Sequence, residues 1–227
     1  MAHSILVIAE SGSGKSHAIQ FLDPKETFII NVANKPLPFK GWRNKYKKLD
    51  SKTGKGNLSG TSTSTGILAA MDYVDKKRPD IKNVIIDDWQ YMAAFEYFNR
   101  ADETGYKKFT DIGQALASVA KKPASMRDDL FIFYLTHSEE TSDERGTRKQ
   151  KAKTIGKMVD EKLTIEGLFA IVLYAKVKKN ADGEMEYVFQ TKTSGYNTCK
   201  SPYGMFEETD VDNNLQLVKD AIIEYEQ

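Results

Sequence analysis

The segment that most constrains this chain is residues 9–16, Ala-Glu-Ser-Gly-Ser-Gly-Lys-Ser, which directly follows the apolar run Ile5–Ile8. A buried strand that leads into a small-residue loop ending in Lys-Ser is typical of a phosphate-binding P-loop. The backbone N–H groups of such a loop point inward at the phosphates of a nucleotide. The residues expected to contact the nucleotide are Glu10, Ser11, Gly12, Ser13, Gly14, Lys15, Ser16 and His17.

Two residues of this loop carry the chemistry. Lys15 is expected to reach the β- and γ-phosphates as a point charge and to act in catalysis, and the Ser16 hydroxyl is expected to ligate Mg²⁺. A helix predicted over residues 15–22 would turn the positive end of its dipole toward the same anion. Ala9 stands where the usual spacing begins with Gly.

A second segment, Asn83-Val84-Ile85-Ile86-Asp87-Asp88, has the Walker B pattern of an apolar strand that ends in a carboxylate. Asp87 is expected to hold Mg²⁺, mostly through water, because Mg²⁺ keeps much of its hydration shell. The alternative is that Asp87 caps a helix. Asp88 is the candidate for orienting the attacking water in phosphoryl transfer, and a cap for the helix that starts at Trp89 is an equal alternative.

Strand-like and helical patterns alternate along most of the chain. This alternation predicts an α/β fold, with a mostly parallel sheet between helices. Asn180–Gly183 between two β-rich runs predicts an antiparallel hairpin near the C-terminus. Strands are predicted over 4–9, 27–32, 83–87, 130–136, 168–178 and 184–191, and helices over 65–77, 89–100, 107–121, 155–163 and 213–225.

Length and composition limit the alternatives. A chain of 227 residues suits one α/β domain over 1–227, with a mobile charged loop at 138–153 and an acidic helical tail at 205–227. The net charge is +1, so any polyanion site must be a local patch. Cys199 is the only cysteine, which fits a reducing cytoplasm, and no apolar run is long enough to span a membrane.

Two basic segments are candidates for contact with nucleic acid. Residues 40–55 carry seven Lys or Arg against one Asp, with Trp42 and Tyr46 interleaved. Basic groups beside stacking aromatics are what sequence-tolerant single-strand binding requires. The second segment is the charged loop at 138–153. The candidate contact residues in the two segments are Trp42, Arg43, Lys47, Arg145, Arg148, Lys149 and Lys151.

With these motifs in this order, the chain resembles the RecA-like P-loop ATPases, and more narrowly the compact bacteriophage RecA/Rad51-related proteins of single-strand annealing and recombination. In additional-strand ATPases a polar residue ends the strand between the P-loop and Walker B strands, and the resemblance gives that role to His137. It also implies single-stranded DNA contact by residues 138–153, and completion of a neighbouring subunit's ATP site by Lys176 and Lys178.

The resemblance implies an Mg-ATP-binding, ATP-hydrolysing protein of phage DNA recombination or replication, in the cytoplasm of the host. It further implies a homo-oligomer, as a ring or short assembly, and a recombination or replication partner protein. The chain departs from the family after the second strand, where Asn31-Val32-Ala33-Asn34 has no catalytic acid. An ATP-gated loader for a helicase or annealing protein, with little hydrolysis, and a nucleotide or small-molecule kinase are the alternatives.

Overall fold

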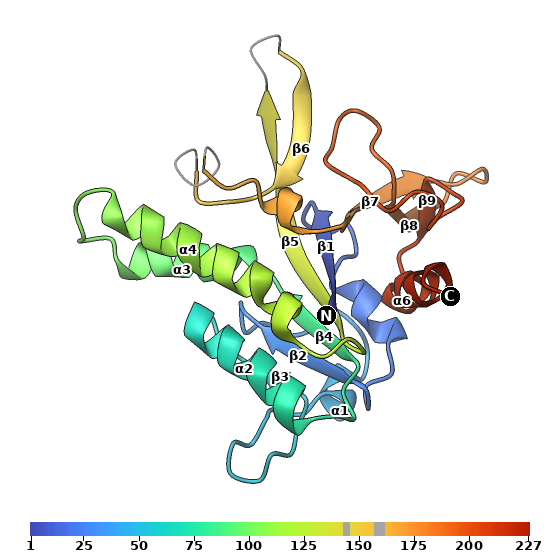
Figure 1. The fold of residues 1–227 in the computed structure, drawn as a ribbon. Coiled ribbons are helices and arrows are strands. Elements are labelled where there is room, and N and C mark those ends of the chain that lie inside the picture. The colour runs from blue at the N-terminus through green and yellow to red at the C-terminus, as the bar shows by residue number, and fades with distance from the viewer. Residues whose placement is uncertain (143–145, 157–161) are drawn as a thin grey trace.

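The computed structural model describes residues 1–142, 146–156 and 162–227, and its centre is one large sheet (Figure 1). The order of the strands differs from their order in the sequence, as crossover connections through helices require. Across the sheet, the strands are β3 (Leu58–Ser59), β2 (Thr27–Asn31), β4 (Asn83–Asp87), β5 (Phe131–Ser142), β1 (His3–Ala9), β7 (Ile171–Lys179), β8 (Met185–Gln190) and β9 (Asp210–Asp212).

Most of this sheet is parallel, as the sequence predicts. Every pairing from β3 across to β7 is parallel, and β7–β8 and β8–β9 are antiparallel. The predicted hairpin around Asn180–Gly183 is confirmed, since Lys179 pairs with Met185 across it. Because β1, β4 and β5 are parallel, the residues that follow them gather at one edge of the sheet.

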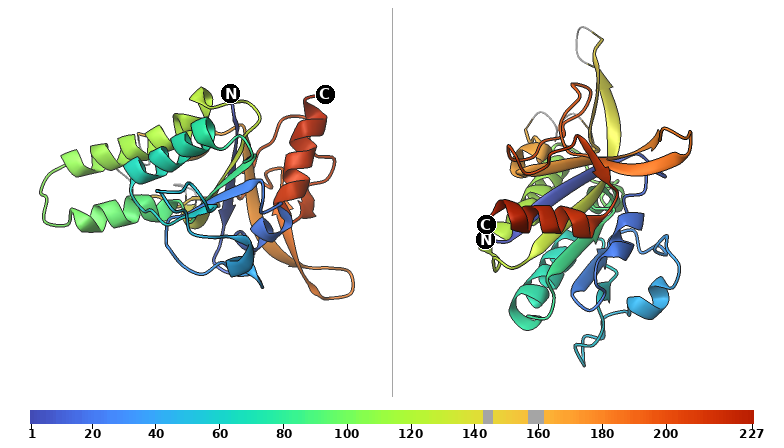
Figure 2. Two further views of the ribbon diagram at one scale, coloured as in Figure 1. Left: turned by 90° about the horizontal axis from the view of Figure 1, so that it is seen from below. Right: turned by 90° about the vertical axis from the view of Figure 1, so that its right-hand side faces the viewer.

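Helices cover both faces of the sheet (Figure 2), and an apolar cluster lies on each face. Alternate residues of β1 face opposite sides: Leu6 and Ile8 pack in one cluster, and Ile5 and Val7 in the other. The first cluster lies under α2 (Ser64–Lys77), α3 (Gln90–Asn99) and α4 (Lys107–Lys121), and the second under the 3₁₀ helix η1 (His17–Phe21) and α6 (Leu215–Tyr225). Short elements α1 (Trp42–Lys45), η2 (Lys122–Ser125) and η3 (Ile165–Leu168) complete the list of described helices.

The acidic C-terminal segment is part of the core. Asn214 caps α6, because its side chain accepts hydrogen bonds from the N–H groups of Gln216 (2.8 Å) and Leu217 (3.3 Å). Leu215, Val218 and Ile222 are buried against the sheet. The predicted helix is therefore confirmed, and its acidic side chains belong to the outer face of a packed element.

The helix predicted over residues 15–22 is wrong in type and length. The structure has a five-residue 3₁₀ helix over His17–Phe21, and Leu22 is already extended. Pro24 follows closely and disfavours a helical conformation at the residue before it. Because so short a helix supplies little dipole, the backbone of the loop itself is what an anion would meet.

The mobile loop predicted over residues 138–153 is also wrong in its described part. Strand β5 continues to Ser142 and pairs antiparallel with β6 (Arg148–Ala152), from Ser138↔Ala152 to Ser142↔Arg148. Figure 1 shows this β5–β6 ribbon extending beyond the sheet. Arg145, a candidate DNA contact, lies outside the described residues, as does most of the helix predicted over 155–163.

Within the described part of the chain, no helix combines the length and the apolar character needed to cross a membrane.

Candidate functional site

The P-loop connects β1 to η1 through two glycines in the left-handed region, Gly12 (φ +84°) and Gly14 (φ +90°). Ser13 fixes the loop, because its hydroxyl donates to the carbonyl of Glu10 at 2.6 Å. A Cβ at position 14 would lie 2.8 Å from Cδ1 of Tyr187. Gly14 is therefore required both by its backbone conformation and by the close approach of β8.

The sheet order brings the P-loop and the end of β4 together. Strand β5 lies between β1 and β4, so the tips of the two motif strands flank it. Ser16 donates a hydrogen bond from Oγ to Oδ1 of Asp87 at 2.7 Å. Nζ of Lys15 lies 2.5 Å from Oδ1 of Asp88. The two sequence motifs thus form one site.

Asp88 is the centre of a buried charge cluster. Its carboxylate is fully buried and pairs with Lys15 and with Lys35, and Nε2 of His137 lies 3.5 Å from its Oδ1. Its backbone is left-handed, with φ +59°, which is uncommon for a residue other than glycine. Such conformations occur where surrounding contacts hold the chain, often at functional sites.

The pKa values of Asp87 and Asp88 are shifted in opposite directions. Burial and the neighbouring charge of Asp88 raise the pKa of Asp87 above its ordinary value. Burial also acts to raise the pKa of Asp88, but the hydrogen bond with His137 and the charge of Lys15 outweigh it and hold that pKa well below its ordinary range. Asp88 is therefore an ionised carboxylate whose charge is balanced by cations, whereas Asp87 is a buried carboxylate whose charged form is disfavoured.

Asp87 has unused bonding capacity. Its Oδ2 atom is buried and has no hydrogen-bond partner among the described residues. Cations bind such an oxygen, and Mg²⁺ commonly takes one or two carboxylates together with phosphate oxygens and water. The donor set fits Mg²⁺, with Asp87 and the Ser16 hydroxyl as the residues that would hold it. No larger cluster of His, Cys, Asp and Glu suited to a metal is found in the described ranges.

The helix-cap interpretations of the two aspartates are wrong. Helix α3 starts at Gln90, its N-cap is Trp89, and no side chain makes a capping bond there. Gln90 instead ties the helix to β5, because its Oε1 accepts from the Thr136 hydroxyl (3.2 Å) and from the His137 N–H (3.1 Å). This contact fixes His137 beside Asp88.

Lys35 is a site residue that the sequence analysis missed. It follows β2 and comes directly after residues 31–34, which include no acid. Asn31 holds the loop: its Nδ2 donates to the Lys35 carbonyl at 2.6 Å, and its Oδ1 accepts from the Lys35 N–H at 3.3 Å. Burial acts to lower the pKa of Lys35, but its hydrogen bond and charge interaction with Asp88 prevail and raise it. The site therefore has a second firmly charged lysine.

A cavity of about 600 Å³ opens in front of this cluster. Its size lies within the range of small-molecule sites. The predicted nucleotide-contacting residues Glu10 to His17 all line it, together with Lys35, Tyr91, His137 and Tyr187. The His17 and Tyr187 rings stack with centroids 6.4 Å apart. Tyr91 and Tyr187 gave no signal in the sequence, because neither lies in a motif.

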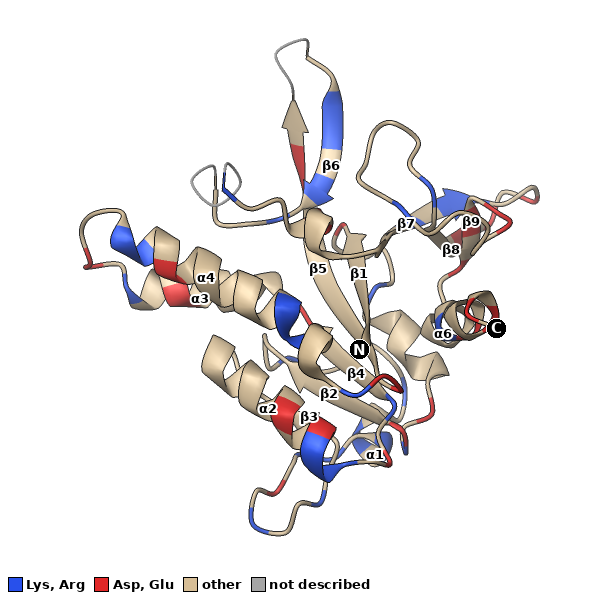
Figure 3. Ribbon diagram, viewed as in Figure 1, with Lys and Arg blue, Asp and Glu red and all other residues tan. Residues whose placement is uncertain are grey.

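The other predicted site residues lie elsewhere. Lys176 and Lys178 pair with Asp210 within the chain, at 2.8 and 3.3 Å. Arg148, Lys149 and Lys151 lie on β6, where Figure 3 shows a band of basic residues. Lys151 pairs with Glu139 at 3.1 Å, and Arg148 with Glu140 at 3.4 Å.

Trp42, Arg43 and Lys47 lie in and after α1, outside the cavity. Trp42 is partly buried against the core, and the Arg43 guanidinium lies over its ring, 5.3 Å from the centroid. The expectation that Tyr46 stacks on bases is wrong, because Tyr46 is buried and packs edge-on against Phe39.

Comparison with known proteins adds no relative. A scan against protein-family models finds no match, and a search of the curated proteins returns no similar protein.

Replacing Asp87 with Asn should stabilise the protein in the absence of ligand. The substitution removes a desolvated carboxylate beside Asp88, and we expect the free energy of unfolding at pH 7 to rise by about 1 kcal/mol, as is common when functional strain is relieved. A raised native pKa means that wild-type stability falls as pH rises through it. The gain should thus shrink as pH falls toward 4.

Urea denaturation of both proteins across this pH range measures the difference. A variant that is less stable at pH 7, or a gain that grows toward low pH, would contradict the assigned electrostatics.

Proposed function

We propose that this protein binds Mg-ATP in the cavity between the P-loop and β4 and hydrolyses it. The observation that carries the proposal is that Lys15 and Ser16, which line the cavity, contact the buried Asp88 and Asp87, 73 and 71 residues away in the sequence. Phosphoryl transfer depends on positioning and on electrostatic stabilisation. Two lysines and a cradle of loop N–H groups supply both.

The strand order supports a RecA-like relationship. In the structure β5 lies between the P-loop strand β1 and the Walker B strand β4, which is the arrangement expected for additional-strand ATPases. His137 follows the buried part of β5 and lies beside Asp88. We therefore include membership of the RecA-like family in the proposal, and the parallel α/β sheet is the observation that supports it.

The charge cluster suggests how the chain's own residues act. Without phosphate, Lys15 and Lys35 neutralise Asp88. Phosphate oxygens would compete for both ammonium groups, since charge-assisted hydrogen bonds to phosphate are strong. Asp88 would then keep His137 as its partner, and the pair could orient a water for attack. Lys35 would stabilise charge on the transferred group together with Lys15.

We propose single-stranded DNA as the polymer partner, in phage recombination or replication. The β5–β6 ribbon supports a link to the nucleotide, because Nε2 of Gln150 on β6 donates to Oε1 of Glu10 in the P-loop at 3.3 Å. Loop changes at the phosphates would therefore reach the basic residues of β6 directly. A homo-oligomer and a partner protein of the same process belong to this proposal.

A second candidate, an ATP-gated loader with little hydrolysis, is favoured by one observation. In the ligand-free arrangement Lys15 and Lys35 balance the charge of Asp88, and its lowered pKa makes it a poor general base. The two candidates differ in turnover and share the same nucleotide site.

ATP turnover with and without single-stranded DNA tests the proposal. We expect Mg-dependent hydrolysis, stimulation by DNA that high salt reverses, and a loss of at least about 100-fold in Lys15→Ala. Circular dichroism of the variant would show that the fold is retained. Nucleotide binding without turnover would favour the loader, and unchanged turnover in Lys15→Ala would refute the assigned site.

Lys35→Ala should lower kcat by about tenfold or more, because it removes a cation aimed at the transferred phosphate. Lys40→Ala is the matched control, since Lys40 is exposed and does not line the cavity. Steady-state kinetics of both variants separates them. Equal rates for Lys35→Ala and wild type, or equal losses in the two variants, would remove Lys35 from the mechanism.

A further inference from the structure

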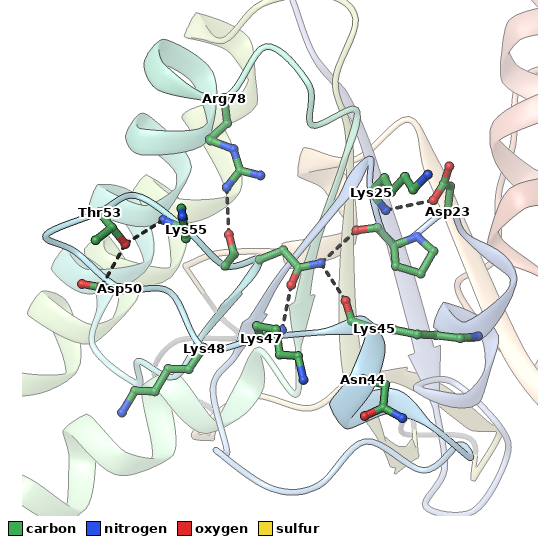
Figure 4. Close-up of a pocket in the computed structure, with 13 residues that line it drawn as sticks. Asp23, Lys25, Asn44, Lys45, Lys47, Lys48, Asp50, Thr53, Lys55 and Arg78 are labelled. Atoms are coloured by element: carbon green, nitrogen blue, oxygen red, sulfur yellow. Dashed lines mark hydrogen bonds between the residues drawn. The ribbon is translucent and has the colours of Figure 1, made fainter.

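A second large concavity lies away from the P-loop. It has a volume of about 760 Å³, and Figure 4 shows its lining residues. Asp23 and Lys25 precede β2, and Arg78 precedes β4, so this pocket opens at the amino ends of strands whose carboxyl ends bear the nucleotide site. We call it the lysine pocket, after its residues Lys25, Lys45, Lys47, Lys48 and Lys55.

Hydrogen bonds build the floor of the lysine pocket. The Asn57 side-chain amide holds its own segment against Pro24 and against residues 45–47. Its Nδ2 donates to the carbonyls of Pro24 (2.8 Å) and Lys45 (3.3 Å), and its Oδ1 accepts from the Lys47 N–H (2.9 Å). Gly56 has φ +109°, and a Cβ there would lie 2.4 Å from the Lys48 carbonyl oxygen. The segment is therefore folded against itself, and its lysines project from a fixed base.

Positive charge predominates in the pocket, where five lysines and one arginine outnumber two aspartates. All five lysines are exposed, and none forms an ion pair in the part of the chain that the structure describes. The two acids of the pocket serve its backbone instead. Asp23 accepts from the Lys25 N–H and Asp50 from the Lys52 N–H, each at 2.9 Å. Arg78 is already paired with Asp80 at 2.7 Å.

Five unpaired like charges around one hollow repel one another and attract a polyanion. Lysines contact phosphates as point charges, without the fork geometry by which arginine binds a carboxylate or a phosphate through two parallel hydrogen bonds. Asn44 and Thr53 add side-chain groups for hydrogen bonds at the rim. This chemistry matches a sugar–phosphate backbone, which is bound without sequence preference.

We propose that the lysine pocket binds the backbone of single-stranded DNA, at the end of the sheet opposite the nucleotide. The identity of this polymer rests on the proposed function, whereas the presence of an anion site rests on the pocket alone. DNA held in the lysine pocket would be bound independently of the β5–β6 ribbon.

The test compares two double variants with the same change in net charge. Lys45→Gln with Lys47→Gln alters the pocket; Lys121→Gln with Lys179→Gln, both exposed and unpaired among the described residues, is the control. Affinity for a labelled thymidine oligonucleotide is measured by fluorescence anisotropy over a range of salt, and ATP binding is measured in parallel.

We expect about a tenfold loss of affinity at low salt for the pocket variant, and a salt dependence (log K against log salt) shallower by about 1.4, which is two single-strand phosphate contacts. The control should match wild type, and all proteins should bind ATP equally. Equal DNA affinities in the two variants would overturn the inference and leave the ATPase proposal intact.

Two other outcomes would also overturn it. Wild-type protein that binds ATP but no oligonucleotide would refute both the DNA partner and this pocket's assignment. If polyglutamate of matched charge competes as well as the oligonucleotide, and the pocket variant loses both equally, the pocket is a site for acidic protein rather than for a nucleic-acid backbone.

Discussion

The pairing of Lys15 and Lys35 with the buried Asp88 is the interaction on which the site depends. An unpaired charge is costly to bury in a protein, so the buried Asp88 and Lys15 need their partners in place, and the more exposed Lys35 adds a second cation to Asp88. The cluster draws one residue from the P-loop, one from the loop after β2 and one from the end of β4, and it therefore exists only if the sheet has the observed order. Asp87 lies beside it with an unsatisfied oxygen, which a ligand would complete.

The two ends of the sheet have different chemistry. The carboxyl ends of β1, β4 and β5 carry a mixed cluster of acids and lysines beside a cavity of about 600 Å³. At the amino ends of β2 and β4 the pocket has five lysines without an ion pair among the described residues, on a base fixed by Asn57. Acids beside lysines suit a site that exchanges partners during a reaction, whereas unpaired lysines suit static contact with phosphates. The β5–β6 ribbon touches the P-loop through Gln150 and Glu10, so nucleotide state can affect it more readily than the lysine pocket.

Local motifs made the cluster at the proposed nucleotide site predictable, and long-range contacts made the rest unpredictable. Lys15, Ser16 and Asp87 are set by strand-then-loop patterns that can be read in a few residues. Lys35 is not, because the Asn31 hydrogen bonds that aim it have no pattern signature. Strand β6 and the end of β5 were missed since both faces are polar there, which hides the alternation typical of a strand. Tyr46 was misjudged because burial depends on how residues 40–57 fold back, and composition does not encode that.

The central claim is that a triphosphate and its Mg²⁺ are held jointly by Ser16 and Asp87 beside Lys15. The most direct measurement is a double-mutant cycle on the Mg²⁺-dependent part of ATP affinity, by calorimetry of wild type, Ser16→Ala, Asp87→Ala and the combined variant. If both residues hold one ion, each single variant should lose most of the Mg²⁺-dependent gain and the double variant should lose little more. Additive losses, or a gain that survives in all three variants, would contradict the account.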